Sequence, residues 1–218
     1  MSFLVLMRHG ESVWNFDNRF TGSVDVPLTD TGRAEAQRAG RLLRRHRLSI
    51  DHAFSSVLQR AADSLDIVLS VLGQEHLQPH RTPLLNERDY GRLQGMDKAE
   101  AARLYGASQV HSWRRSYADG PPGGESLKDV AARLLPYFEA EIAPQLGAGK
   151  NVLIVAHEHP LRAIIMQLEK LAPAQLLELE LATAVPVVYE FGPGGAIADK
   201  RILANESLQS ECREKSEH

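Results

Sequence analysis

Two runs of consecutive hydrophobic residues dominate the pattern along the chain, FLVLM at 3–7 and VLIVA at 152–156. Neither run alternates with polar residues, which is typical of strands buried on both faces in a parallel sheet. A shorter run at 53–54 predicts a third strand. Hydrophobic segments at 187–191 and 196–203 flank the sequence GPGG, and this arrangement predicts a hairpin at one edge of the sheet.

Helical patterns separate these strands. They predict helices over about 30–47, 60–72, 97–105, 109–117, 126–145 and 160–171, with a bend near Pro136. The segment DGPPGGES at 119–126 predicts a loop, because it is rich in Pro and Gly. Alternating strands and helices predict an α/β fold, a three-layer α/β/α sandwich around a mainly parallel sheet with an antiparallel edge.

Length and composition limit the classes of protein that this chain can belong to. It has 218 residues, of which 43% are hydrophobic, so it can bury a substantial core. We expect a single domain over residues 1–206 and a polar, mobile tail over 207–218. A net charge of −3 argues against nucleic acid or an anionic membrane as a partner. No segment has the pattern of a membrane span or a signal peptide, so we expect a soluble cytoplasmic protein.

The two longest hydrophobic runs both lead into histidine. Arg8 and His9 follow the first run, and His157 follows the second. The carboxyl ends of parallel strands lie at one edge of a sheet, where open α/β folds bind ligands. A lone histidine is more often a core or loop residue, but two at matching positions favour chemistry. We therefore expect His9 and His157 to face one another across a crevice.

These residue types suit phosphoryl transfer. Neutral imidazole is a good nucleophile near neutral pH, and a neighbouring arginine suits an electrophile that carries a bidentate anion. Gly10 would let backbone amides approach the same oxygens, and Arg60 at the start of a helix could add a second guanidinium. The reaction also needs a proton carrier, for which LNERDYG at 85–91 offers Glu87 or Asp89. Spacing alone does not choose between these two carboxylates.

Several motifs occur in order between residues 3 and 203. They include LVLMRHGESVWNFDNRFTG at 4–22, SSVLQRA at 55–61, LNERDYGRLQG at 85–95, WRRSY at 113–117 and PPGGESL at 121–127. Together these motifs resemble the cofactor-dependent phosphoglycerate mutases, in their short form, within the histidine phosphatase superfamily. RHG alone would indicate only the superfamily, whereas the combination points to the mutases.

The resemblance implies that His9 becomes phosphorylated and that Glu87 donates and accepts the proton, with Arg8, Arg60 and His157 completing the catalytic set. It implies interconversion of 3- and 2-phosphoglycerate in glycolysis and gluconeogenesis, primed by 2,3-bisphosphoglycerate and without a metal. Family members are often homodimers or homotetramers, so such an assembly is expected. The substrate-binding residues that it implies are Ser12, Asn15, Thr21, Gly22, Arg88, Tyr90, Lys98, Arg114, Arg115, Glu158 and His159.

The sequence AHEHPLRA departs from the family pattern, which usually has Gly-Asn where Glu158 and His159 stand. A carboxylate there would repel a phosphoryl group unless it turns outward or pairs with Arg60 or Arg162. A residue in place of glycine could also be strained at positive φ. A metal site at HEH is not expected, because the sequence offers no clear third ligand. Two alternatives therefore stand beside the mutase: a phosphomonoester phosphatase, and a weakly active or non-catalytic binder of phosphorylated ligands.

Overall fold

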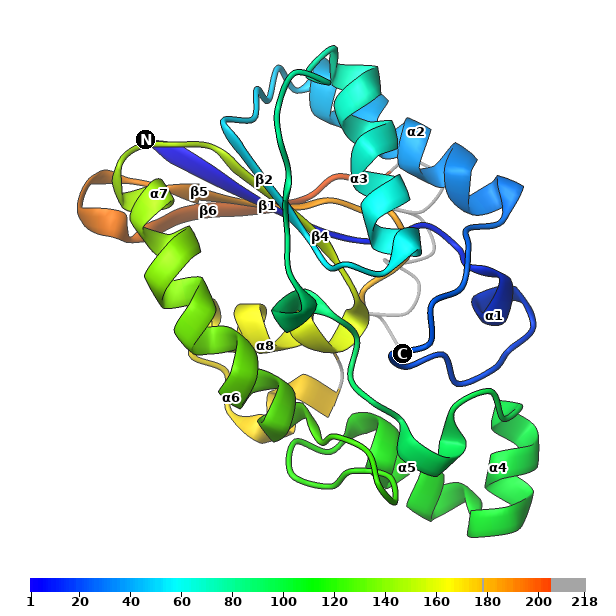
Figure 1. The fold of residues 1–218 in the computed structure, drawn as a ribbon. Coiled ribbons are helices and arrows are strands. Elements are labelled where there is room, and N and C mark those ends of the chain that lie inside the picture. Colours follow the sequence, from blue (N-terminus) through cyan, green and yellow to red (C-terminus); the bar gives the residue numbers. More distant parts are fainter. Residues whose placement is uncertain (178, 205–218) are drawn as a thin grey trace.

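One sheet forms the centre of the computed structural model, which describes residues 1–177 and 179–204 (Figure 1). Within these residues the strand order is β3-β2-β4-β1-β5-β6. The first four strands in this order are parallel, and β5 and β6 add an antiparallel edge, as predicted. The tail predicted for 207–218 lies outside the described residues. The strands are β1 (Ser2–Arg8), β2 (His52–Ser55), β3 (His80–Arg81), β4 (Val152–Ala156), β5 (Val187–Phe191) and β6 (Ile197–Ile202).

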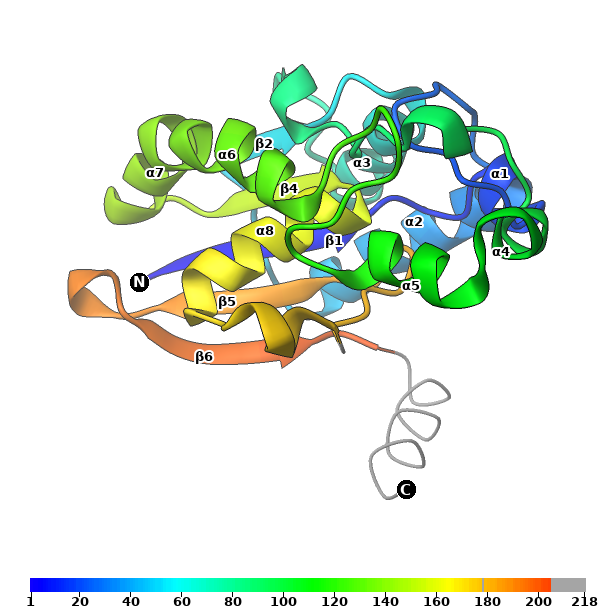
Figure 2. The ribbon, with the colours of Figure 1, turned by 90° about the horizontal axis from the view of Figure 1, so that it is seen from below.

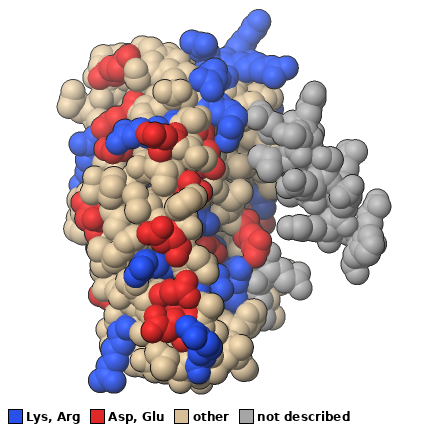
Figure 3. All heavy atoms as spheres, turned by 90° about the vertical axis from the view of Figure 1, so that its right-hand side faces the viewer, with Lys and Arg blue, Asp and Glu red and all other residues tan. Residues whose placement is uncertain are grey.

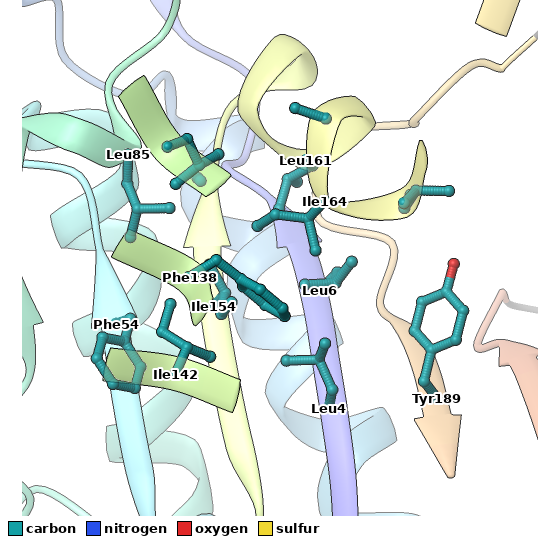
Figure 4. Close-up of a cluster of buried hydrophobic side chains, with 14 of the residues drawn as sticks. Leu4, Leu6, Phe54, Leu85, Phe138, Ile142, Ile154, Leu161, Ile164 and Tyr189 are labelled. Carbon is teal, nitrogen blue, oxygen red and sulfur yellow. The ribbon is translucent and has the colours of Figure 1, made fainter. Parts of the chain in front are cut away.

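Helices cover both faces of this sheet, so the predicted three-layer sandwich is confirmed. Along β1, Leu4 and Leu6 belong to the core beneath one group of helices (Figure 4), whereas Val5 and Met7 belong to the core beneath the other. Burial on both faces explains why the strand is hydrophobic at successive positions. The helices on the first face are α6 (Leu127–Tyr137), α7 (Ala143–Gly147) and α8 (Glu158–Glu169), and those on the second are α2 (Asp30–Arg45) and α3 (Gln59–Leu72).

A smaller group of helices lies beyond the carboxyl ends of β1 and β4. It consists of α1 (Val13–Phe16), α4 (Lys98–Tyr105) and α5 (Ala107–Arg115), and Figures 1 and 2 both place it at the end of the molecule opposite the N-terminus. Asp97 caps α4 as predicted, since its carboxylate accepts from two backbone N–H groups. This end has its own apolar core, formed by Phe20, Tyr90, Leu93, Ala101 and Val110.

The helix predicted over 126–145 is interrupted. After α6 ends, a π-helical turn follows over Phe138–Ile142 and α7 completes the segment. Pro136 lies inside α6, one residue before its end, whereas Pro144 lies in the first turn of α7 and has no N–H to donate to the π-helical turn before it, which explains the change. The shortest elements are not predicted from the sequence, because they contain too few residues to show a period. They are α1, β3 and the 3₁₀ turns at Pro83–Leu85, Gly91–Leu93, Pro173–Leu177 and Pro193–Gly195.

The surface carries charges of both signs. On the face shown in Figure 3, Lys and Arg side chains are interspersed with Asp and Glu, in keeping with the net charge of −3. Attraction for an anion therefore has to come from a local cluster of cations. Over residues 1–177 and 179–204, no helix is both long enough and apolar enough to span a bilayer.

Candidate active site

His9 lies directly after β1. Its backbone N–H donates to the Ala156 carbonyl at 3.0 Å, which continues the pairing of β1 with β4. Its ring Nδ1 lies 2.6 Å from the Gly10 carbonyl. Because a carbonyl only accepts, Nδ1 carries the proton and Nε2 keeps its lone pair. Burial, followed by the charges of Arg60 and Arg8, holds the pKa of His9 well below its usual range. His9 is therefore a neutral, nucleophilic ring.

His157 lies after β4 and faces His9. The two ring centroids are 4.9 Å apart in an edge-to-face arrangement, so the predicted meeting of the two strand ends is confirmed. Nε2 of His157 lies 2.7 Å from the Ser56 hydroxyl, and none of the described residues pairs with Nδ1. Burial, followed by the charge of Arg60, lowers the pKa of His157 well below its usual range. His157 is thus a neutral, fully buried ring beside His9, and its Nδ1 has no hydrogen-bond partner among the described residues.

Two guanidinium groups accompany the histidines. Arg60, near the start of α3, is 1% exposed and donates to two backbone carbonyls, including that of Gly22, at 2.8 Å. Burial lowers the pKa of Arg60 to about 10, so it remains a cation at neutral pH. Arg8 ends β1 and donates to the Leu181 carbonyl at 2.9 Å. Both arginines line the same pocket as His9, so an anion beside this ring meets two fixed positive charges.

Gly10 has a different role from the predicted one. Its backbone N–H donates to the Ser64 hydroxyl at 3.0 Å. A Cβ at this position would lie 2.2 Å from the Gly32 carbonyl oxygen. Glycine is therefore needed for the close approach of α2 to the loop that carries His9, and the Gly10 amide is already occupied by a protein partner.

Glu87 is the carboxylate that the structure brings to the pocket. Asp89, which the sequence left as an alternative, does not line it and accepts from the Gly91 N–H at 2.6 Å. Burial raises the pKa of Glu87. His159 and other nearby donors lower it by more than burial raises it, so this pKa lies well below its usual range. An ionised carboxylate beside a neutral imidazole can accept a proton, and a phosphoryl dianion bound nearby raises its pKa, so that Glu87 can hold this proton and then donate it.

The pocket is small and partly open to solvent, which suits a small ligand. Among the predicted site residues, Ser12, Arg88 and His157 do not line it, whereas Arg19 and Phe20 line it without having been predicted. Both belong to the NRFTG motif, which was the signal that could have identified them. The lining consists of Arg8, His9, Asn15, Arg19, Phe20, Thr21, Gly22, Arg60, Glu87, Tyr90, Lys98, Arg114, Arg115, Glu158 and His159.

Arg88 and Ser12 support the fold around the pocket. Arg88 is fully buried and donates to the backbone carbonyls of Trp113 and Glu125. Its guanidinium carbon lies 4.3 Å from the centroid of the Tyr90 ring. Ser12 caps α1 with its hydroxyl. Arg88 thus holds Tyr90 and the end of α5 in place, and the pocket wall depends on it indirectly.

A second group of cations reaches the pocket from α4 and α5. Lys98 is the first residue of α4, and Arg114 and Arg115 end α5. Consecutive residues on a helix point about 100° apart. Arg114 and Arg115 nevertheless both line the pocket, because the end of α5 faces it. Burial, followed by the charge of Arg114, lowers the pKa of Lys98. The pocket therefore has a cationic group at His9 and another at the α4–α5 end.

Glu158 connects these two groups. Its Oε2 lies 3.4 Å from Arg8 Nη1 and its Oε1 lies 3.6 Å from Arg115 Nη1, so its ion-pair partners are these two arginines and not Arg60 or Arg162, which the sequence suggested as possible partners. The predicted strain is also wrong, because Glu158 begins α8 and its φ is not positive. Burial raises the pKa of Glu158. The charges of Arg8 and other nearby cations lower it by more than burial raises it, so this pKa lies below its usual value. The carboxylate is therefore an anion built into the cationic pocket.

His159 pairs with Glu87 across a distance of 3.0 Å between Nδ1 and Oε1. Over the part of the chain that the structure describes, no group of three or more His, Cys, Asp and Glu side chains is placed to hold a metal ion. The HEH sequence therefore forms a carboxylate–imidazole pair with Glu87 and two ion pairs with arginines. That the reaction needs no metal stays a prediction.

Comparison with known proteins decides the family. The model of the histidine phosphatase superfamily, branch 1, matches residues 4–201. The chain belongs to the histidine phosphatase superfamily. It is 51% identical over 201 residues to a 2,3-bisphosphoglycerate-dependent phosphoglycerate mutase of Bradyrhizobium diazoefficiens, covering 92% of this chain and 97% of that protein. A mutase of the same name from Methylocella silvestris is 50% identical over 200 residues, with the same coverage. These relatives confirm the resemblance inferred from the motifs.

Solved structures of the superfamily confirm the fold. A mycobacterial hydrolase superimposes with a TM-score of 0.78 at 27% identity, covering 92% of this chain and 96% of that chain. A mycobacterial glucosyl-3-phosphoglycerate phosphatase gives a TM-score of 0.76 at the same identity and coverage. This histidine phosphatase chain is therefore close in sequence to proteins named as mutases and shares its fold with proteins named as a hydrolase and a phosphatase.

Proposed function

We propose that this histidine phosphatase interconverts 3-phosphoglycerate and 2-phosphoglycerate through a phosphohistidine at His9. One observation supports the proposal: the neutral imidazole of His9, whose Nε2 has no partner among the described residues, lines a pocket with one set of cations from β1 and α3 and another from α4 and α5. Phosphoglycerate carries a phosphate and a carboxylate, and each can meet one of these cationic groups. Relatives about half identical to this chain, whose names state the same activity, support the assignment.

The chemistry that these residues can perform is a double transfer. Nε2 of His9 attacks the phosphorus of 2,3-bisphosphoglycerate, the bond from phosphorus to the sugar-acid oxygen breaks, and Glu87 supplies the proton that this oxygen takes up. Arg8 and Arg60 balance the charge on the phosphoryl group during transfer. The monophosphate leaves, 3-phosphoglycerate binds with its free 2-hydroxyl towards the phosphohistidine, Glu87 takes the proton of this hydroxyl, and the phosphoryl group moves to its oxygen. The bisphosphate so formed turns in the pocket and returns its 3-phosphoryl group to His9, Glu87 gives the proton back to the 3-oxygen, and 2-phosphoglycerate is released. The bisphosphate is thus both primer and intermediate.

The decisive experiment compares the wild type with His9→Ala. The wild type should form 2-phosphoglycerate from 3-phosphoglycerate faster when trace 2,3-bisphosphoglycerate is present, and it should carry an acid-labile phosphate on His9. His9→Ala should lose both properties, with isomerisation at least about a thousandfold slower, since the nucleophile is gone. Isomerisation at the wild-type rate without this ring would refute the mechanism.

A phosphatase on the same scaffold is the second candidate, favoured by Glu158. This carboxylate pairs with Arg8 and Arg115 and so reduces the positive charge available to a bisphosphate. Weaker retention would expose phosphohistidine to water and favour release of inorganic phosphate. Measuring isomerisation and phosphate release together, in the wild type and in Glu158→Gly, separates the two activities. If neither activity occurs but phosphoglycerate binds, the chain is a binder.

The remaining expectations concern the cofactor and the assembly. We propose 2,3-bisphosphoglycerate as the priming donor, which the names of the relatives support. Incubation with zinc and with EDTA tests the expected independence from metals, since neither treatment should change the rate. A cytoplasmic homodimer or homotetramer remains a proposal, and light scattering of the purified protein tests the number of subunits.

A further inference from the structure

The two oxygens of Glu87 have different surroundings. Oε1 lies 2.8 Å from the backbone N–H of Arg88, 3.0 Å from Nδ1 of His159 and 3.4 Å from the backbone N–H of His159. Among the described residues, no hydrogen-bond donor is paired with Oε2. Glu87 also lines the pocket. One oxygen of this carboxylate is therefore held by the protein, and the other is available to a ligand.

The His159 side chain is the part of this arrangement that the family pattern does not supply. It is 3% exposed, and its ring lies edge-to-face with Tyr90, with centroids 6.0 Å apart. Nε2 lies 3.4 Å from the Arg114 carbonyl, a longer contact than that between Nδ1 and Glu87. Both ring nitrogens thus face acceptors, and the shorter contact to a carboxylate favours the proton on Nδ1.

Charged groups surround this ring from each element that packs against it. Glu87 and Arg88 face the ring from the loop after residue 85, and Glu158 precedes His159 on α8. On the α5 side, the ring contacts the backbone carbonyl of Arg114. Burial, followed by the charge of Arg88, lowers the pKa of His159. The ring is therefore neutral at neutral pH and can act as a single directed donor to Glu87.

We propose that His159 is a positioning residue, which holds Oε1 of Glu87 so that Oε2 exchanges the proton with the substrate oxygen. The inference rests on the proposed function, in which Glu87 carries that proton. A carboxylate held at one oxygen cannot rotate away from the reacting atoms, and the correct geometry is kept through both transfers. The histidine ring therefore acts on the reaction through Glu87 and needs no contact with the substrate.

Phosphate donors with different leaving groups test this role. Transfer from 2,3-bisphosphoglycerate to His9 expels an alkoxide, which needs a proton from Glu87, whereas p-nitrophenyl phosphate expels a phenolate that is stable without one. Rapid-quench labelling of His9 measures the first transfer, and the burst of nitrophenolate measures the second. The variants are His159→Leu, which removes the donor, and His159→Asn, which keeps an N–H near the position of Nδ1.

In His159→Leu, labelling by 2,3-bisphosphoglycerate should be slower by roughly ten- to a hundredfold, and the nitrophenolate burst should stay within about twofold of the wild type. His159→Asn should recover labelling to within about fivefold of the wild type. An equal loss with both donors, or no loss with either, would overturn the proposal. If the wild type itself is not labelled by the bisphosphate, the proposed function fails, and that result is distinct from any ratio between variants.

A measurement on the unmodified protein covers the case in which His159→Leu does not fold. Histidine labelled with ¹⁵N reports directly whether Nδ1 or Nε2 carries the proton. The wild type should show His159 protonated at Nδ1 near neutral pH, with a shift in this resonance in Glu87→Gln. A proton on Nε2 alone would overturn the proposal, because His159 could then not donate to Glu87.

Discussion

Arg8 Nη1 lies 3.4 Å from Glu158 Oε2. The last residue of β1 thus pairs with the first residue of α8, the helix that follows the neighbouring strand β4. Each side chain is about one fifth exposed, which leaves the pair accessible to a competing anion. A phosphorylated ligand that binds Arg8 therefore has to approach a carboxylate already in the pocket. Glu158 therefore reduces the positive charge that the pocket presents to a phosphorylated ligand.

Glu158→Gln should strengthen the binding of bisphosphate more than that of monophosphate. The removed charge repels each phosphate, and the bisphosphate carries more negative charge, so its Kd should fall about tenfold against about threefold for 3-phosphoglycerate. Isothermal titration calorimetry measures both constants. Glu180→Gln is the matched control, because Glu180 pairs with Arg115 at 2.7 Å but is 73% exposed and does not line the pocket. Equal changes for both ligands would contradict this account.

The His9 ring should stay neutral under mildly acidic conditions. Burial and two arginines lower its pKa, so protonation begins at lower pH than for a free histidine, whose pKa is about 6.5. In the empty protein, the His9 resonances should therefore change little between about pH 7 and pH 6, where a free histidine is largely converted to imidazolium. NMR of ¹³C-labelled histidine, read against free histidine in the same buffer, checks this expectation. A midpoint at the ordinary value would contradict it.

Gly10→Ala should destabilise the fold near the nucleophile. The added Cβ would meet the Gly32 carbonyl at 2.2 Å, so the loop or the start of α2 has to move. We expect a loss of about 1–3 kcal/mol in the free energy of unfolding, measured by urea denaturation. Gly147→Ala is the matched control, since a Cβ there meets nothing within 4 Å, and it should stay within about 0.5 kcal/mol. Similar effects of the two variants would refute the packing role of Gly10.

Arg88→Met should lower stability more than it weakens substrate binding. The buried guanidinium donates to two backbone carbonyls, and leaving them unpaired should reduce the free energy of unfolding by at least about 2 kcal/mol. The KM for 3-phosphoglycerate should change less than about threefold. Arg114→Met, which removes a pocket cation, should show the opposite pattern, with KM raised about tenfold and stability nearly unchanged. Both variants are compared by urea denaturation and steady-state kinetics.

Much of the site could be predicted because strand ends and motifs are local features. The strands ending at Arg8 and Ala156 are apparent from continuous hydrophobicity, and their parallel pairing brings His9 to His157. The structural role of Arg88 could not be predicted. A charged residue inside a motif is interpreted as a ligand contact until its burial is known. Glu87 and Asp89 could not be separated either, since both lie in one turn and only packing shows which carboxylate faces the pocket.

The sequence by itself determined the order of strands and helices, the continuous hydrophobicity that buries the sheet, and the motifs that identify the family. These properties depend on residue type and spacing over short stretches. Only the tertiary structure decided the partners of Glu158, the Glu87–His159 pair and the packing role of Gly10. Each of these contacts joins residues from separate elements, and its geometry follows from how the helices pack at the sheet edge.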